Sequence, residues 1–469
     1  MASANTGTRH NERHVMSRFL SAPPPDTGLR PVQGPRTLPL ISTLKLVRKP
    51  TDLAVSLRHG YGDIALTSAL GRNVVVAQGP AAAEELTLNR DKAFSTEPVY
   101  GFALGKFFQR GVLLMDFEEH HRDRRIMQQA FTADRLASYH RQVVRKVRES
   151  INELPVGPGV DLRAVFKNLT LDIALEVFAG AELDAAAAAA LNHACVDLIE
   201  AGGALIRFPI PGLRWSRGLR SRRRLETFFS DLVSAKRSGE GDDLMSELCR
   251  AEVDGQRLSD AAVIDHMIFM IFAAHDTATV ALTATACELA KSPEWQDCVR
   301  AEVQMLPETI TYDDLNSMPL AELVMKESIR LRPPVPVLPR AAVKDTELCG
   351  FHIPKGTFVI VLVGANHQID DVWPDAARFD PDRFRTSEHD AGRHRMAWMP
   401  FGGGVHKCMG MNFARMEVLT VLHRMLREYE WSVPQDFSMP AEDGSLTVNT
   451  GFPATVRRRS DHPAGDRSR

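Results

Sequence analysis

Residues 401–410, which read FGGGVHKCMG, constrain the fold of this 469-residue chain more than any other segment. Three consecutive glycines allow backbone conformations that other residues avoid, and they let the backbone approach another group closely. Cys408 follows the glycines and precedes MNFARMEVLTVLHRML, an amphipathic pattern that predicts a helix. Because the N-terminal N–H groups and the dipole of a helix favour an anion, we expect a lowered pKa for the Cys408 thiol and a thiolate at this position.

A single thiolate restricts the chemistry of this loop. One ligand is too few for a zinc ion, which takes four. It is enough for haem iron, because the porphyrin supplies four nitrogens and one axial Cys pushes electron density toward cleavage of an O–O bond. Two other interpretations stay open from the residues alone. One is a buried structural Cys beside a Gly-rich turn, and the other is a nucleophilic Cys, for which the local protease signatures are absent.

The loop resembles one from a known family. The pattern FGGGxHxCxG fixes seven positions, and a chance match somewhere in the chain has odds of roughly one in a million. The segment is similar to the haem-ligand loop of the cytochrome P450 family, the haem-thiolate monooxygenases, of the soluble bacterial type. The resemblance extends in order from about residue 34 to residue 459. It implies that Cys408 is the iron ligand, that the cofactor is haem b (iron protoporphyrin IX), and that Phe401 and Ala273 contact it.

The composition is that of a globular protein in a reducing compartment. Hydrophobic residues make up 44% and charged residues 25%, which excludes disorder for most of the chain. The 57 Lys and Arg against 59 Asp and Glu give a net charge of -2, so no global charge favours nucleic acid. The six cysteines are scattered, without a CxxC pair. We therefore expect a cytoplasmic location and no nucleic-acid partner.

Strand patterns occur near both ends of the chain, and helical patterns fill its middle. Residues 63–67 and 73–78 predict a hairpin, and residues 346–364 contain turn signals before a β-branched strand. Helical patterns dominate from about residue 118 to residue 332. We expect a mainly α fold with a small β region (α+β), which the resemblance identifies as the cytochrome P450 fold.

The expected domain is single and interwoven, and it spans residues 31–459. The Pro-rich residues 1–30 and the polar residues 460–469 are expected to be disordered tails. The apolar run at residues 267–274 is too short to cross a bilayer, and the N-terminus lacks the apolar core of a signal peptide. We therefore expect no transmembrane anchor.

Residues 259–291 predict one long helix that is apolar on all sides before the sequence HDTAT. Asp276 and Thr277 inside such a helix are costly unless they have partners, and a solvated helix end is the alternative. The resemblance assigns to them the acid–alcohol pair that delivers protons to dioxygen, and so a catalytic role. His275 is expected to point about 100° away from Asp276 around the helix. The chain departs from the family pattern at Ala274, where many relatives have a Gly that loosens the helix.

Two charged motifs have a surface interpretation when taken alone. Glu327 and Arg330 share a face of a predicted helix, as in a weak surface salt bridge. The resemblance instead implies a buried structural group of Glu327, Arg330 and Arg383, the last from the segment Pro-Asp-Arg-Phe, that braces the haem loop. Residues 118–125 read EEHHRDRR, typical of a solvated charged face.

In that segment the resemblance implies that His120 and Arg124 bind the haem propionates, together with Arg340 and His406. Two buried carboxylates need compensating cations, so four donors is a reasonable number. The basic residues 214–224 predict a solvated helix start, and they resemble the substrate-mouth loop of relatives that oxidise sterols, terpenoids and retinoids.

The resemblance implies an enzyme that inserts one oxygen atom from O2 into a C–H bond of a bulky apolar molecule, such as a sterol, terpenoid or fatty acid. The chain shows no flavin or iron–sulfur domain, so electrons are expected from a ferredoxin or flavodoxin with an NAD(P)H-dependent reductase. Apolar segments near residues 96–111, 206–211 and 337–338, with Asn449, are expected to line the pocket. A peroxide-using haem-thiolate enzyme and a non-enzymatic haem sensor are the alternatives.

Overall fold

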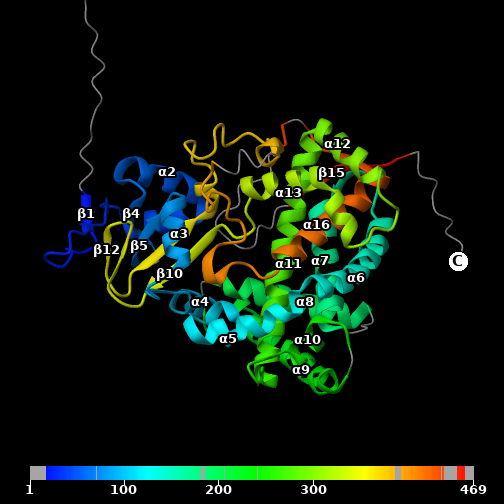
Figure 1. Cartoon of the computed structure of the whole chain (residues 1–469), viewed down its shortest axis with the longest axis horizontal. Coiled ribbons are helices and arrows are strands. Elements are labelled where there is room, and N and C mark those ends of the chain that lie inside the picture. The colour runs from blue at the N-terminus through cyan, green and yellow to red at the C-terminus, as the bar shows by residue number, and fades with distance from the viewer. Residues whose placement is uncertain are drawn as a thin grey trace, which may run out of the picture.

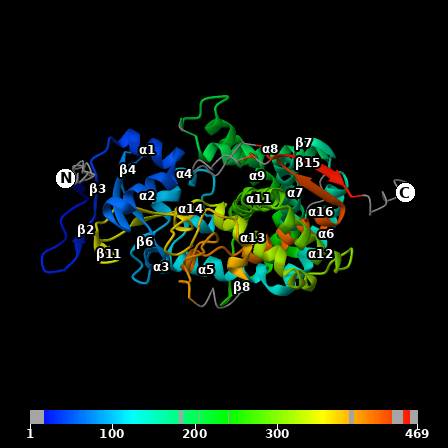
Figure 2. The same cartoon turned by 90° about the horizontal axis from the view of Figure 1, so that it is seen from above.

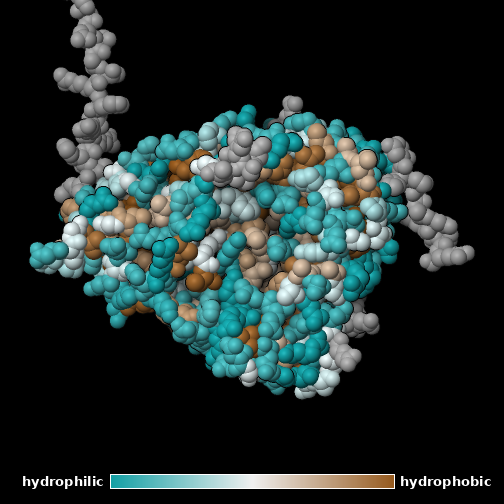
Figure 3. Space-filling model, in the orientation of Figure 1, coloured by the Kyte–Doolittle hydropathy of each residue, from teal (hydrophilic) through white to brown (hydrophobic). Residues whose placement is uncertain are grey.

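The structure is a computed structural model that describes residues 17–69, 71–180, 185–204, 206–239, 241–385, 392–434, 436–437 and 451–459. A β-rich part and a larger helical part lie side by side (Figures 1 and 2). The face seen in Figure 3 is mainly hydrophilic, with scattered apolar side chains and a hollow near its centre. The expected fold class, mainly α with a small β region, is therefore confirmed.

The β-rich part joins strands from distant parts of the sequence. Its main sheet has the order β1-β3-β4-β5-β13-β10-β6. The expected hairpin is present as β4 (Ile64–Ala69) and β5 (Arg72–Ala77), which pair antiparallel. β5 pairs in parallel with β13 (Phe358–Leu362), so strands more than 280 residues apart share one sheet. This pairing fits the expectation of one interwoven unit.

The remaining strands are short: β1 Ser17–Phe19, β2 Arg30–Pro31, β3 Gln33–Pro35, β6 Phe94–Ser95, β7 Gly157–Asp161, β8 Glu252–Val253, β9 Gln256–Arg257, β10 Val337–Ala342, β11 Thr346–Leu348, β12 Phe351–Ile353, β14 Tyr429–Ser432 and β15 Pro453–Arg458. Three small sheets complete the β structure of the described residues, with the orders β11-β12-β2, β14-β15-β7 and β8-β9.

The prediction that residues 1–30 form a disordered tail is wrong for part of that range. β1 pairs antiparallel with β3 at the edge of the main sheet, and Arg30 and Pro31 pair with β12. The backbone of these residues therefore exchanges hydrogen bonds with strands, and their Pro-rich composition does not prevent it because edge strands tolerate Pro. Residues 1–16 and 460–469 lie outside the described residues.

The helices have these bounds: α1 Pro39–Arg48, α2 Pro50–Tyr61, α3 Pro80–Leu88, α4 Glu97–Leu104, α5 Phe117–Gln128, α6 Ala133–Asn152, α7 Leu162–Ala179, α8 Ala185–Gly202, α9 Arg214–Ser238, α10 Leu244–Arg250, α11 Asp260–Lys291, α12 Pro293–Gln304, α13 Pro319–Leu331, α14 Val363–Asn366 and α16 Met411–Glu428. Short 3₁₀ turns include Pro381–Phe384 and Gly404–His406. Pro begins several of these helices, as expected for a residue with a fixed φ and no N–H.

The long helix α11 runs through the middle of the helical part in both views (Figures 1 and 2). Ser259 caps its N-terminus by accepting a hydrogen bond from the N–H of Ala262. By length and composition alone α11 is apolar enough to cross a membrane, but 72% of its most apolar window is buried inside the protein. It is therefore a core helix, and its all-round apolar surface is explained by neighbours on every side.

Candidate active site

The cysteine loop is held by close contacts that require glycine. Gly404 has φ +61°, and a Cβ atom there would collide with the backbone carbonyl of Thr87 at the end of α3. Gly402 has φ +67°. The N–H of Cys408 donates to the carbonyl of Phe401 at 2.9 Å and closes the loop. The glycines thus press the loop against α3 and set Cys408 just before the first turn of α16.

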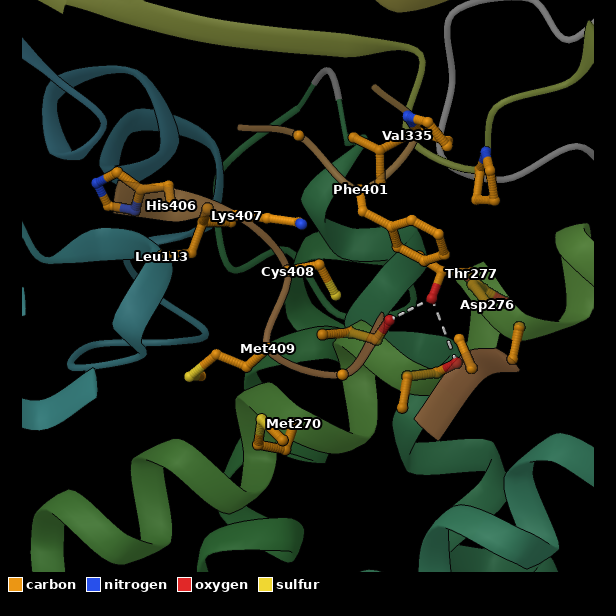
Figure 4. A pocket seen from close by; sticks show the side chains of 18 of the residues that line it. Leu113, Met270, Asp276, Thr277, Val335, Phe401, His406, Lys407, Cys408 and Met409 are labelled. Atoms are coloured by element: carbon orange, nitrogen blue, oxygen red, sulfur yellow. Dashed lines mark hydrogen bonds between the residues drawn. The ribbon is translucent and has the colours of Figure 1, made fainter. Parts of the chain in front are cut away.

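Cys408 faces an internal cavity of about 440 Å³ (Figure 4). Burial raises the pKa of its thiol, whereas the N–H of Gly410 and the charges of Arg124 and Lys407 lower it. The expected lowered pKa is therefore wrong for the thiol in this structure, because removal from water outweighs the favourable helix terminus. The Cys408 side chain has accessible surface because it borders the cavity, and not because it lies on the outside of the protein.

The opposite wall of the cavity is α11. Ala273, Asp276 and Thr277 all line it, as the sequence predicts (Figure 4). The Thr277 hydroxyl donates to the carbonyl of Ala273 at 2.7 Å. Many relatives have a Gly at the position of Ala274, and that Gly loosens the helix. In this chain α11 is continuous through Ala274 and has no break there.

A group of imidazoles and guanidinium groups lies at one edge of the cavity. The rings of His120 and His406 have their centroids 4.0 Å apart. Arg124 donates from Nη2 to the carbonyl of Lys407 at 2.5 Å, which ties α5 to the cysteine loop. Arg340 on β10 is 5% exposed and donates to the carbonyl of Pro339. Three of the four predicted side chains, all but Arg340, line the cavity directly.

The positive charge of these groups has few carboxylates close by to balance it. Burial, followed by the charges of His406 and Arg124, lowers the pKa of His120 to about 3. Burial also lowers the pKa values of Arg124, Arg340 and His406. Within the part of the chain that the structure describes, neither Arg124 nor Arg340 forms an ion pair with a carboxylate. Such a group fits an anionic ligand, so the residues present suit a haem whose two propionates would supply the missing charge.

Glu327, Arg330 and Arg383 come together away from the cavity in a buried group, as predicted. Arg330 donates to both carboxylate oxygens of Glu327, at 2.7 and 2.8 Å. Arg383 lies 3.3 Å from Glu327 Oε1 and donates to the carbonyls of Pro374 and Asp375.

His367 joins this group to the cysteine loop. Its Nδ1 is 2.9 Å from the carbonyl of Arg330, and its Nε2 is 2.9 Å from the N–H of Met399. A neutral imidazole that donates from Nδ1 and accepts at Nε2 satisfies both partners. Burial accordingly lowers the pKa of His367 to about 3.

The structure adds site residues that the sequence did not predict. Asp116 lies 3.4 Å from His406. Burial raises its pKa, but hydrogen bonds from His406, Ser95 and two backbone N–H groups lower it to about 2. Glu417 lines the cavity from α16, and burial raises its pKa to about 8. The sequence could have indicated Glu417, because a charged residue on the apolar face of a predicted helix is unusual. Nothing comparable in the sequence marks Asp116.

The expected substrate-contacting segments are present only in part. Residues near 96–111 contribute Tyr100 and Leu104, and residues 337–338 also line the cavity. Ile206 and Phe208 are instead 53% and 70% exposed and do not line it, which corrects the prediction for residues 206–211. Asn449 lies outside the described residues. The basic run is also not wholly solvated, because Arg222 is buried beside Asp265 on α11.

The chain is similar to known proteins over most of its length. The chain matches the family model described as Cytochrome P450 over residues 32–452. It is 40% identical over 452 residues to the protein named cytochrome P450 136 of Mycobacterium tuberculosis, across 94% of this chain and 91% of that protein. It is 28% identical over 430 residues to cyclooctat-9-en-7-ol 5-monooxygenase of Streptomyces melanosporofaciens, across 88% and 92% of the two chains.

It is also 29% identical over 407 residues to abscisic acid 8'-hydroxylase 2 of Oryza sativa subsp. indica, across 83% of this chain and 79% of that one. The structure of the retinoic acid-bound cyanobacterial CYP120A1 has the same fold, with a TM-score of 0.80 at 24% identity over 91% of this chain and 99% of that one. The family model and the mycobacterial relative cover nearly the whole sequence. The chain therefore belongs to the cytochrome P450 family and is a haem-dependent monooxygenase.

Proposed function

We propose that the cavity beside Cys408 is where one oxygen atom of O2 enters a C–H bond of a bulky apolar molecule while the other atom leaves as water. One observation carries this proposal. A single cavity is bounded on one side by Cys408 and on the other by Asp276 and Thr277, with mainly apolar side chains between them. The thiol and the acid–alcohol pair thus face the same enclosed space.

In this proposal the Cys408 thiolate would hold haem b, which would supply the chemistry that activates dioxygen. The N–H of Gly410 and the charges of Arg124 and Lys407 favour the thiolate form of Cys408. Phe401 lines the same cavity beside the loop. The close approach of Gly404 to the Thr87 carbonyl at the end of α3 fixes the position of the loop that carries Cys408.

His120, Arg124, Arg340 and His406 bind the two propionates in this proposal. Arg124 and Arg340 remain charged because a guanidinium group does not lose its proton in proteins. Both are suited to bidentate recognition of a carboxylate. The contact of His406 Nε2 with Asp116 Oδ1, at 3.4 Å, orients the imidazole, and its ring contact with His120 fixes both rings.

Asp276 and Thr277 manage protons in this proposal. The Thr277 hydroxyl donates its hydrogen to the carbonyl of Ala273, so the lone pairs of its oxygen can accept a hydrogen bond in the cavity. Asp276 supplies the proton-exchanging group next to it. A relay through these two side chains requires an acceptor within hydrogen-bond reach, and the mainly apolar walls offer few competing polar groups.

The substrate class in this proposal is a bulky apolar small molecule such as a terpenoid, sterol or fatty acid. The cavity walls include Leu104, Phe269, Phe272, Val337 and Leu338. Two relatives are named for reactions of abscisic acid and of cyclooctat-9-en-7-ol, and the solved neighbour for bound retinoic acid. These names support a terpenoid-like molecule rather than a polar metabolite.

Electrons come, in this proposal, from a ferredoxin or flavodoxin with an NAD(P)H-dependent reductase in the cytoplasm. Lys407 on the cysteine loop is exposed, and so are Arg122 and Arg125 on α5, the helix that Arg124 joins to the loop, although these two pair with Asp123 and Asp254. An acidic electron carrier would be attracted to this surface.

The experiment is turnover with ¹⁸O2 and a surrogate ferredoxin–reductase pair, after a screen for apolar compounds that shift the haem spin state. The expected product carries one ¹⁸O atom. In Thr277→Ala, haem and substrate binding should persist while electrons divert to hydrogen peroxide, and Asp276→Asn should slow turnover about 10²-fold. Product formed only with hydrogen peroxide would favour the peroxide-using alternative. Binding without turnover would favour a sensor.

A further inference from the structure

The chain that joins α8 to α9 carries apolar side chains on its outside. Residues 206–211 read IRFPIP, and Ile206, Phe208 and Ile210 are all exposed. Phe102, near the end of α4, is 69% exposed. We call these four side chains the apolar loop patch. Exposed apolar side chains that gather at one place, rather than singly, indicate contact with a partner or with a membrane.

Arg207 holds this patch in place. Its Nε donates to the carbonyl of Ala204 at 3.2 Å, and its Nη1 donates to the carbonyl of Phe102. Its guanidinium carbon lies 4.4 Å from the centre of the Phe102 ring and 5.7 Å from that of Trp215 on α9. Arg207 therefore joins the loop to α4 and to α9, so the apolar side chains are presented without much further ordering on binding.

A strongly basic segment follows the patch. Residues 206–225 contain seven arginines and no Asp or Glu. Arg217 and Arg222 pair with carboxylates of α8 and α11. Arg220, Arg223 and Arg224 are exposed, and within the described part of the chain none of these three forms an ion pair. Three unpaired guanidinium groups thus lie within the first three turns of α9, next to the apolar loop patch.

The position of these arginines is unfavourable for the helix that carries them. The first turn of α9 has no acidic residue, and cations near a helix N-terminus oppose the helix dipole. Arg220 also lies three and four residues from Arg223 and Arg224, so the like charges repel one another. At about 100° per residue, the three point away from the buried face that contains Trp215 and Leu225. An external anionic surface would relieve both effects.

Helix α1 repeats the same combination of exposed apolar and basic side chains. Its apolar residues at i, i+1, i+4 and i+7 share one face and are exposed: Leu40, Ile41, Leu44 and Val47. Lys45 and Arg48 are exposed beside them, and residues 27–51 contain no Asp or Glu. In Figure 2, α1 lies on the upper side of the view, from which the chain between α8 and α9 also protrudes, and α5 lies on the lower side.

We propose that the apolar loop patch and the exposed arginines of α9 dock the protein on an anionic lipid surface. The apolar side chains would enter the headgroup region and the guanidinium groups would bind lipid phosphates, as in proteins that lie on a membrane without spanning it. This docking is separate from the proposed reaction and does not depend on it. Because α4 also contributes Tyr100 and Leu104 to the cavity wall, an apolar molecule dissolved in lipid would meet the protein beside the cavity.

Two observations favour lipid over a second copy of the chain. In a two-fold symmetric dimer the same patch of both subunits would meet, so the unpaired arginines of two chains would repel each other across the interface. In addition, α5, which carries the basic surface proposed for the electron carrier, lies on the opposite side of the molecule in Figure 2. A lipid-bound protein would therefore keep that surface open to its carrier.

The first experiment measures co-sedimentation of the full-length, haem-loaded protein with vesicles. We expect stronger binding to phosphatidylcholine vesicles with about 30% phosphatidylglycerol than to phosphatidylcholine alone. Phe208→Asp should weaken binding to the anionic vesicles about 10–100-fold, because a buried aromatic ring is replaced by a charge. Met305→Asp is the control, since Met305 is an exposed apolar residue just after α12 and should leave binding at the wild-type level.

The second experiment tests the charge. Arg223→Gln combined with Arg224→Gln should weaken binding to anionic vesicles about 30-fold and leave the weak binding to neutral vesicles unchanged. The same pair should reduce the loss of binding that wild type shows as salt is raised. Arg141→Gln combined with Arg148→Gln, at two exposed positions of α6, is the control and should bind as wild type. Circular dichroism and the haem spectrum verify that every variant is folded and loaded.

Four results would overturn the proposal. Wild type could fail to bind anionic vesicles, or Phe208→Asp could bind them as tightly as wild type. Retention on heparin without vesicle binding would make the arginines a site for polyanions. A wild-type dimer that Phe208→Asp converts to a monomer in sedimentation would show that a second copy covers the loop. None of these readouts involves turnover, so each judges the docking surface and leaves the proposed reaction untouched.

Discussion

Arg330 and Arg340 are both buried, at 0% and 5% exposure, but they differ in how their charge is met. Arg330 donates to both oxygens of Glu327 and to the carbonyls of His367 and Ala376. Arg340 donates to the carbonyl of Pro339 and has no carboxylate ion pair within the described chain. The guanidinium of Arg330 meets a carboxylate and backbone carbonyls within the protein, whereas that of Arg340 leaves charge for something else to balance.

This difference separates a structural role from a binding role. A buried ion pair with all its hydrogen bonds made is rigid, and removal of one partner leaves the other charge uncompensated. A buried cation without a partner is unfavourable until an anion arrives, so part of its stabilisation appears only with the ligand. On the proposed function, the Glu327 group is expected to brace the cysteine loop through His367, and the Arg124 and Arg340 group to bind the haem propionates.

The largest expected effect comes from removing the carboxylate of Glu327. Glu327→Ala leaves Arg330 and Arg383 without their carboxylate and should destabilise the fold by about 3–5 kcal/mol. Urea unfolding and the yield of haem-loaded protein measure this loss. Glu322→Ala on the same helix is the control, because Glu322 is partly exposed and its removal should cost less. A haem-loaded Glu327→Ala protein of wild-type stability would contradict the comparison.

The next prediction concerns the buried cations Arg124 and Arg340. Arg124→Met and Arg340→Met should leave the helical circular dichroism signal unchanged, yet speed haem transfer to apomyoglobin about 10–100-fold. This range corresponds to hydrogen bonds to a charged group worth about 1.5–3 kcal/mol. Arg125→Met is the control, since Arg125 is exposed on the same helix and pairs with Asp254. Equal haem loss in Arg125→Met would mean that general charge, rather than the buried position, holds the cofactor.

A smaller effect concerns pH and His367. Its pKa of about 3 lies below the unfolded value of about 6.5, so its share of stability is present above pH 6.5 and is lost as the pH falls. Wild type should lose about 2 kcal/mol more than His367→Gln between pH 7 and pH 5. Urea unfolding of both holoproteins at the two pH values measures the difference. The same slope in both proteins would show that His367 does not stay neutral in the fold.

Much of the fold could be predicted because its signals are local. The hairpin of β4 and β5 follows from two strand-like runs that flank a Gly-containing turn, and the helix α11 follows from a long apolar run. The edge strand β1 could not be predicted, because Pro-rich composition says nothing of a distant partner such as β3. The exposed residues 206–211 were misplaced for a related reason, since their apolar character does not reveal which way the loop turns.

Some features of the site could likewise be predicted from the sequence, and others could not. Cys408, Asp276 and Thr277 stand in recognisable patterns, and the cavity brings them together. The raised thiol pKa and the approach of His275 to Asp276 could not be predicted, because both depend on packing. Helical spacing separates neighbouring side chains by about 100°, but rotamers let His275 Nδ1 come within 3.4 Å of the Asp276 carboxylate.

The central claim is that Cys408 holds the haem, and the reduced, carbon monoxide-bound spectrum tests it most directly. Wild type and Cys298→Ser, a control at an exposed cysteine, should both show the red-shifted Soret band of a thiolate-ligated haem. Cys408→Ser should lose that band because a serine supplies no thiolate. A Cys408→Ser protein that kept the thiolate band would show that another cysteine binds the iron and would contradict the account of the loop.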